Sequence, residues 1–215
     1  MTLGGYETLR RIVREELRAL RLAGLAVVQK THPHSSAGDD DNYACTVRMR
    51  ETDLVLERVP VVAARKGMAA IPDAGDLVLV QFLDGDENAP VIAGTLYNDD
   101  DRPPPNADGD VVLRLPLDAG DGEGVAFKLE SASATAVTLA LGGALKLELK
   151  DDDPVVKIDI RDGSAILTID SDGTVTIKSG KAIALEGGDV SIKGNEIKVE
   201  AQGGLKLKGA TIDLN

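Results

Sequence analysis

Aromatic residues are scarce in this chain: they make up 2% of its 215 residues, and tryptophan is missing altogether. A pocket that grips a flat organic ligand usually recruits aromatic side chains, so the composition argues against such a site. A single cysteine, Cys45, excludes an intrachain disulfide framework and a cysteine-based zinc site. No apolar run approaches the roughly 20 residues that cross a bilayer, and the N-terminus lacks the apolar core of a signal peptide. We therefore expect a soluble chain that is assembled in the cytoplasm.

Acidic residues are in excess: 36 Asp and Glu against 24 Lys and Arg give a net charge of −12. A surface of this charge repels phosphate, which argues against nucleic acid as a partner. The apolar fraction of 43% is enough for one domain of ordinary size or for two small ones.

Residues 5–22 predict an amphipathic helix, because apolar residues recur there at spacings of three and four. Arginine and glutamate occupy the other faces. The helix either lies on the domain that follows or docks on a partner or on copies of itself. The apolar stripe consists of Tyr6, Leu9, Val13, Leu17 and Leu20.

Residues 24–98 contain five apolar runs that are typical of strands, at 25–30, 44–50, 54–61, 77–83 and 91–96. Five strands over roughly 75 residues suit a small closed barrel such as the OB-fold. An OB-fold that binds nucleic acid presents stacking aromatics and a basic face. This chain has neither, so we expect the barrel to be a scaffold. Residues 99–109, with three consecutive prolines, form the expected linker.

Residues 110–215 consist of short alternating segments, and from residue 167 they repeat every seven or eight residues. Each repeat has aliphatic residues at positions i and i+2, which face one side of a strand, followed by a turn rich in glycine. Such a repeat indicates a solenoid or a fibrous β-structure. The pairs are Leu167 and Ile169, Val175 and Ile177, Ile183 and Leu185, Val190 and Ile192, Ile197 and Val199, Leu205 and Leu207, and Ile212 and Leu214.

Two aliphatic residues per repeat give a single chain only a very thin core. No aromatic residue follows Phe127, and the repeat reaches the last residues without the atypical cap that a monomeric solenoid needs. We therefore predict an intertwined trimeric β-helix, or prism, whose axis core is formed by the six pairs from Leu167 to Leu207. Its hydrogen bonds would run between chains, and the longer alternating segments before Leu167 predict a wider base. A single-chain β-solenoid is the alternative.

The segment 71–98 reads IPDAGDLVLVQFLDGDENAPVIAGTLYN and resembles the OB domain of the baseplate assembly protein V family. That family includes the central spike proteins of contractile phage tails and the VgrG-like proteins of type VI secretion. An OB barrel followed by a linker and a β-helix of this repeat length is similar to the family's architecture. The resemblance rests on Pro72, Gly75-Asp76, Val78/Val80/Phe82, Gly85-Asp86, Pro90-Val91, Gly94 and Tyr97-Asn98.

The resemblance implies a homotrimeric structural spike that caps the inner tube and pierces the target envelope when the sheath contracts, touching the membrane only transiently. Residues 98–110 leave no room for the lysozyme domain of some relatives, so we expect no enzyme and no cofactor. The hub is expected to be a separate chain that contacts Tyr6, Leu9, Val13 and Leu17. Some phage spikes bind iron through histidines at the apex, but no histidine follows His34 here. We expect instead a PAAR-type tip protein that contacts Ile212, Leu214 and Asn215.

Other interpretations remain open at this point. His32 and His34 belong to a solvated loop, to a metal site formed across the trimer, or to a catalytic set with Ser35 or Asp39. The acidic runs at 39–41, 99–101 and 151–153 are solvated turns or calcium ligands. The rival functions are an OB-fold module that binds oligosaccharide or nucleic acid on a β-solenoid stalk, and a β-helical enzyme acting on polysaccharide. The kind of particle, whether a phage tail, a bacteriocin-like particle or another injection system, is also open.

Overall fold

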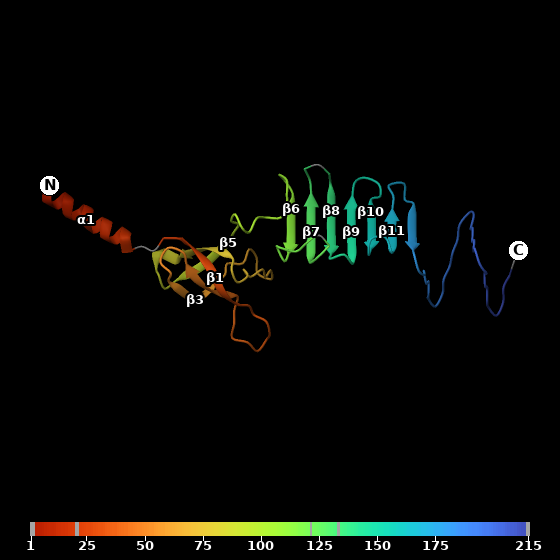
Figure 1. The fold of residues 1–215 in the computed structure, drawn as a ribbon, viewed down its shortest axis with the longest axis horizontal. Helices are drawn as coiled ribbons and strands as arrows, with labels where there is room; N and C mark the ends of the chain where they lie inside the picture. The colour runs from red at the N-terminus through yellow and green to blue at the C-terminus, as the bar shows by residue number, and fades with distance from the viewer. Residues whose placement is uncertain (1–2, 20–21, 121, 133, 214–215) are drawn as a thin grey trace. The chain divides into compact units, whose positions relative to one another are not determined.

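A computed structural model describes residues 3–19, 22–120, 122–132 and 134–213 (Figure 1). Over these residues the chain is mainly β with one N-terminal α-helix, as predicted, and its strands form two antiparallel sheets. It divides into two units, residues 1–108 with 114–118, and residues 109–113 with 119–215. Leu20, Leu214 and Asn215, which the sequence analysis singled out, lie outside the described residues, and so does the side chain of Leu17.

Helix α1 spans Leu3–Ala19 and confirms the predicted N-terminal helix. Its apolar stripe is open to solvent: the exposed fractions of Tyr6 and Leu9 are 60% and 62%, and Val13 is exposed as well. The guanidinium of Arg10 lies over the Tyr6 ring, 5.4 Å from its centroid. The helix therefore presents an apolar surface edged by arginine.

The first sheet has strand order β3-β2-β1-β4-β5, so that β3 and β5 are its outer strands. Val61 forms a bridge with Ile92, and the N–H of Val62 donates to the Ile92 carbonyl at 2.9 Å. These contacts join the two outer strands and close the sheet into a barrel. The strands are β1 (Gly24–His32), β2 (Ala44–Met49), β3 (Val55–Pro60), β4 (Leu77–Phe82) and β5 (Pro90–Leu96), all within two residues of the predicted runs.

The barrel interior is filled by apolar side chains at alternating positions, as the two-residue period of a strand requires. Cys45 is among them: it is fully buried, and burial raises the pKa of its thiol, so it is a core residue of β2. The core consists of Ala26, Val28, Cys45, Val47, Met49, Val59, Val78, Val80, Phe82 and Ile92.

The second sheet is a meander in which each strand pairs with its neighbour in sequence, in the order β12 to β6 (Figure 1). Its strands are β6 (Val111–Leu115), β7 (Val125–Glu130), β8 (Ala136–Leu141), β9 (Leu145–Lys150), β10 (Val156–Ile160), β11 (Ala165–Ile169) and β12 (Val175–Ser179).

The first two predicted repeats differ from expectation, because they pair within the chain. Leu167 lies opposite Ile158 and Ile177, and Ile169 lies opposite Val156 and Val175. The physical reason is the turns, which contain left-handed residues: Asp162 at φ 50°, Gly163 at φ 91° and Gly173 at φ 87°. Such residues reverse a chain tightly and place neighbouring strands side by side.

Residues 180–213 lie in no strand of the described chain, although the aliphatic pairs continue through them. Their trace runs back and forth in a regular zigzag, drawn in blue in Figure 1. Among the described residues, Gly173 is the last with a positive φ, so these reversals are not tight hairpins of the kind that precede them. The hairpin-paired strands therefore end at Gly180, and extended chain without strand pairing follows.

Candidate functional site

One face of the β7–β12 sheet is covered by aliphatic side chains in rows that run across the strands. Residues directly opposite in neighbouring strands share a face, and so do residues two apart in one strand. The middle row is Phe127, Leu139, Leu147, Ile158, Leu167 and Ile177. A second row is Leu129, Val137, Leu149, Val156, Ile169 and Val175.

The third row loses its bulk toward the C-terminal strands. It begins with Val125, Leu141, Leu145 and Ile160, and continues opposite Ile160 with Ala165 and then Ser179. The apolar face therefore narrows from three rows to two at β11 and β12. Each repeat from Ile183 onward also has two aliphatic positions. The two aliphatic rows of β11 and β12 therefore have the same spacing as the pairs of the repeats that follow.

Within its own unit, no second layer of described residues packs on this apolar face. The exposed fractions of Leu129, Leu141 and Leu149 are 38% to 41%, and Val175 and Ile177 are 58% and 55% exposed. A continuous apolar surface of this kind, half-buried over most of its middle row and exposed along its margins, is typical of an interface.

The twelve residues predicted as an axis core form no core in the single chain. Leu167, Ile169, Val175 and Ile177 lie in β11 and β12, on the open face of the sheet. The other eight lie in the zigzag, where the chain folds no second layer over them, so each of them is exposed rather than buried. These eight are Ile183, Leu185, Val190, Ile192, Ile197, Val199, Leu205 and Leu207. Leu185 at 70%, Ile192 at 67% and Val199 at 66% are the most exposed of the eight.

The opposite face of the sheet is mainly polar and carries ion pairs, although Ile166 lies on it between Asp159 and Lys178. The Nζ of Lys146 lies 2.9 Å from a Glu148 carboxylate oxygen, and Lys157 lies 3.1 Å from Asp159. Lys146 also lies opposite Asp159 across the strands. The N–H of Gly163 donates to Asp159 and, together with Lys157 and Lys146, holds the pKa of that carboxyl below its usual value. One face of the sheet thus suits water and the other does not.

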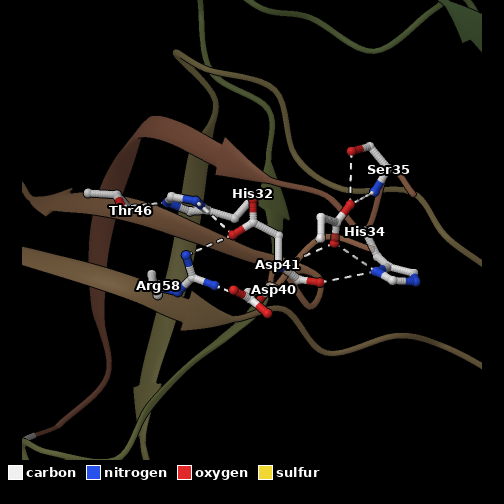
Figure 2. A network of polar contacts seen from close by, with 8 residues as sticks. His32, His34, Ser35, Asp40, Asp41, Thr46 and Arg58 are labelled. Carbon is white, nitrogen blue, oxygen red and sulfur yellow. Dashed lines mark hydrogen bonds and ion pairs between the residues drawn. The ribbon is translucent and has the colours of Figure 1, made fainter. Parts of the chain in front are cut away.

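In the barrel, two strands and one loop form a polar network around His32 (Figure 2). The ring of His32 is buried, with Nε2 3.0 Å from Thr46 Oγ1 and Nδ1 3.5 Å from an Asp41 carboxylate oxygen. Arg58 from β3 pairs with the same Asp41 oxygen at 2.7 Å and donates to the Asp40 carbonyl at 2.9 Å. These contacts fasten the loop that follows β1 to the barrel wall.

Arg58 was missed by the sequence analysis, although the strand gives a signal for it. Apolar residues at Leu56 and Val59 are three apart, which breaks the two-residue alternation. In the structure this break is a β-bulge: the register against β2 shifts there, and Arg58 has a φ of 52°. A bulge re-aims the side chains beside it, and here Arg58 is directed at the loop.

The loop itself is organised by Asp39. Its carboxylate accepts from the N–H and the Oγ of Ser35, at 2.7 Å and 2.9 Å, and from the N–H of Ser36 at 2.7 Å. The Nδ1 of His34 lies 2.9 Å from the other carboxylate oxygen. The Ser36 N–H is the largest of several contacts that lower the pKa of Asp39, while Asp39 raises the pKa of His34. The run 39–41 therefore orders the loop.

The order of these contacts does not suit nucleophilic catalysis. A catalytic triad places the histidine between the nucleophile and the acid. Here Asp39 lies between Ser35 and His34, so the imidazole has no hydrogen bond to the hydroxyl that it would have to activate. His32 and His34 both contact Asp41, His32 at the carboxylate and His34 at the backbone carbonyl. Among the described residues, no group of three or more His, Cys, Asp or Glu is placed to hold a metal ion.

Residues 43–97 match the family model of the type VI secretion system/phage-baseplate injector OB domain, a stretch that covers β2 to β5 of the barrel. No curated protein matches the chain. Among the described residues, no helix is long and apolar enough to span a membrane. The match supports a structural role in a phage or type VI baseplate, and so a place in a tail or injection particle. The barrel thus matches the injector OB domain of this family, in agreement with the predicted resemblance to baseplate protein V and VgrG-like proteins.

Proposed function

We propose that this chain is the central spike protein of a contractile injection baseplate, acting as a homotrimer that caps the inner tube and is driven through the target envelope. The observation that carries the proposal is a combination within one chain. An injector OB domain is followed by a sheet with an uncovered aliphatic face, and the aliphatic positions of that sheet continue into exposed repeats.

The trimer is proposed because other copies of the chain are the simplest cover for that face. Three sheets that turn their aliphatic rows toward a common axis remove those rows from water, at about 25 cal/mol for each Å² of apolar surface. The loss of the third row at Ala165 and Ser179 fits a base that tapers. Beyond Gly180, the four pairs from Ile183 to Leu207 would meet at the axis and form hydrogen bonds between chains.

The proposed role is mechanical, and no catalytic step is assigned to any residue. Helix α1 is the proposed contact with a separate hub protein, through Tyr6, Leu9, Val13 and Leu17. Ile212, which is 49% exposed, is the proposed contact with a PAAR-type tip protein, together with Leu214 and Asn215. Loss of hub binding in a Leu9→Arg pull-down, with Arg11→Glu unaffected, would support the first contact.

The experiment that tests the function is the mass of the purified full chain by light scattering at micromolar concentration. We expect three times the chain mass of 22.5 kDa, unchanged on dilution, because separating the copies would expose the whole aliphatic face. A monomer, or a mass that falls steadily on dilution, would contradict the spike and favour the single-chain β-solenoid.

A further inference from the structure

Four lysines of the alternating segments share one arrangement, in which an acid stands two residues later and forms an ion pair. The Nζ to carboxylate distances are 2.6 Å for Lys128–Glu130, 2.9 Å for Lys146–Glu148, 3.1 Å for Lys157–Asp159 and 2.6 Å for Lys198–Glu200. Residues two apart in an extended chain lie on one face, so each pair is neutral locally. Each of these four lysines therefore has a carboxylate partner in its own segment.

The repeat that contains Leu205 and Leu207 has no such acid. The repeats with Lys178 and Lys193 also have none, but only the repeat at 205–208 carries two lysines at alternate positions. Where the preceding repeat has Lys198 and Glu200, this one has Lys206 and Lys208, so the acid is replaced by a second lysine. Both side chains are exposed, and neither forms an ion pair with any residue that the structure describes. No acidic residue stands between Glu200 and Asp213. The result is an uncompensated cationic pair in a chain of net charge −12.

Because successive side chains of an extended segment point to opposite sides, Lys206 and Lys208 point away from the aliphatic residues of the same repeat. Leu205 and Leu207 take one side of the extended segment, so Lys206 and Lys208 take the other. In the proposed trimer the leucines face the axis, and six ammonium groups from three chains surround the shaft at one level. Like charges held together repel one another, so the lysines cost stability in the trimer. The chain is rich in acidic residues, and the fold gives no structural reason why an acid does not replace one of these lysines.

We propose that Lys206 and Lys208 form a cationic ring that engages the phosphate groups of an anionic membrane surface. The inference rests on the proposed trimeric spike. A cluster of lysines is attracted to anionic lipid within a Debye length of about 10 Å. The acidic remainder of the chain is repelled by the same surface. The two effects together orient the molecule with this end of the repeat toward the membrane.

The test is binding of the full-length protein to vesicles of phosphatidylcholine with or without phosphatidylglycerol, measured by co-sedimentation at low ionic strength. We expect binding to the anionic vesicles only, and release at about 0.5 M salt, where screening is nearly complete. The double variant Lys206→Glu with Lys208→Glu should bind about tenfold more weakly or not at all. The matched control is Arg65→Glu with Lys66→Glu, an equal charge change in an exposed barrel loop, which should leave binding unchanged.

Light scattering on each variant separates the two proposals. A trimer that ignores anionic vesicles would overturn the cationic ring and leave the spike standing, whereas a monomer would overturn both. Equal binding by the Lys206/Lys208 variant, or equal binding to neutral vesicles, would also overturn the ring. So would a preference for a DNA duplex over anionic vesicles, because the phosphate source would then be a different macromolecule.

Discussion

At the scale of single residues, alternation decides whether a side chain needs a partner. Ile192 and Lys193 are neighbours in one repeat, and both are exposed in the single chain. Their positions differ only by the face of the extended segment on which they lie. In a monomer, the two sites would respond alike to a charge. In the proposed trimer, Ile192 lies on the axis and Lys193 lies in water.

Ile192→Asp should therefore destabilise the protein strongly, while Lys193→Asp should have little effect. The first change places three carboxylates together in an apolar shaft, at a cost on the order of several kcal/mol unless they take up protons. The measurement is the thermal unfolding temperature of each purified variant at neutral pH. Equal unfolding temperatures would show that the assigned register is wrong.

The His34–Asp39 contact predicts a pH dependence of the loop at residues 33–42. The hydrogen bond from His34 to Asp39 raises the histidine pKa above its ordinary 6.5, so its stabilising effect is complete below pH 6.5 and is lost as the pH rises through the folded pKa. Asp39 has a lowered pKa, so its effect is present above its ordinary 3.8 and is lost as the pH falls through the folded value. The loop should be most ordered between these two ordinary values.

The measurement is an NMR titration of the His34 ring. Its midpoint should lie above 6.5 in the unmodified protein, and Asp39→Asn should lower it. Asp40→Asn is the matched control, because Asp40 contacts Arg58 through its backbone carbonyl. An Asp39→Asn midpoint that matches the control would show that the contact does not form in solution.

At the scale of elements, the sequence predicts strands well where alternation coincides with burial. The five barrel strands are in this class, since Val78, Val80 and Phe82 point inward while turn residues mark the ends. The bulge at Arg58 was not predicted because the strand was assigned from its number of apolar residues. The shift of the apolar positions from one face of the strand to the other was not considered. Arg58, Asp41 and Thr46 come together only through the pairing of β2 and β3 with the loop, which no local pattern encodes.

In the repeat, the sequence predicts the aliphatic positions but not how the strands pair. Its spacing identified the aliphatic positions, yet the pairs in β11 and β12 turned out to pair within the chain, because Gly163 and Gly173 make tight reversals. Glycines occur in nearly every turn of the repeat, so their presence alone could not separate hairpins from the wider reversals after Gly180. That distinction depends on backbone φ, which the sequence does not give directly.

At the scale of the whole molecule, the end of the paired strands at Gly180 predicts how the chains of the proposed trimer dissociate. Strands β6 to β12 find their backbone partners in the same chain, so copies joined only through that sheet are held by side-chain contacts. Residues 181–213 lie in no strand of the described chain, and in the proposed trimer their hydrogen bonds run between chains. Each such bond contributes on the order of 1 kcal/mol, and all of them must break before one chain can leave.

Full-length trimers should therefore not exchange chains without unfolding. When trimers with and without a mass tag are mixed in native buffer, mixed species should be absent for about a day, since domain unfolding can be that slow. A chain that stops at Gly180 keeps the apolar face of β7–β12 but loses the interchain hydrogen bonds, so it should still associate and should exchange much faster. Native mass spectrometry of both mixtures makes the comparison. Equal exchange rates would mean that residues 181–213 add nothing between chains, and the intertwined shaft would have to be abandoned even if the protein proved to be trimeric.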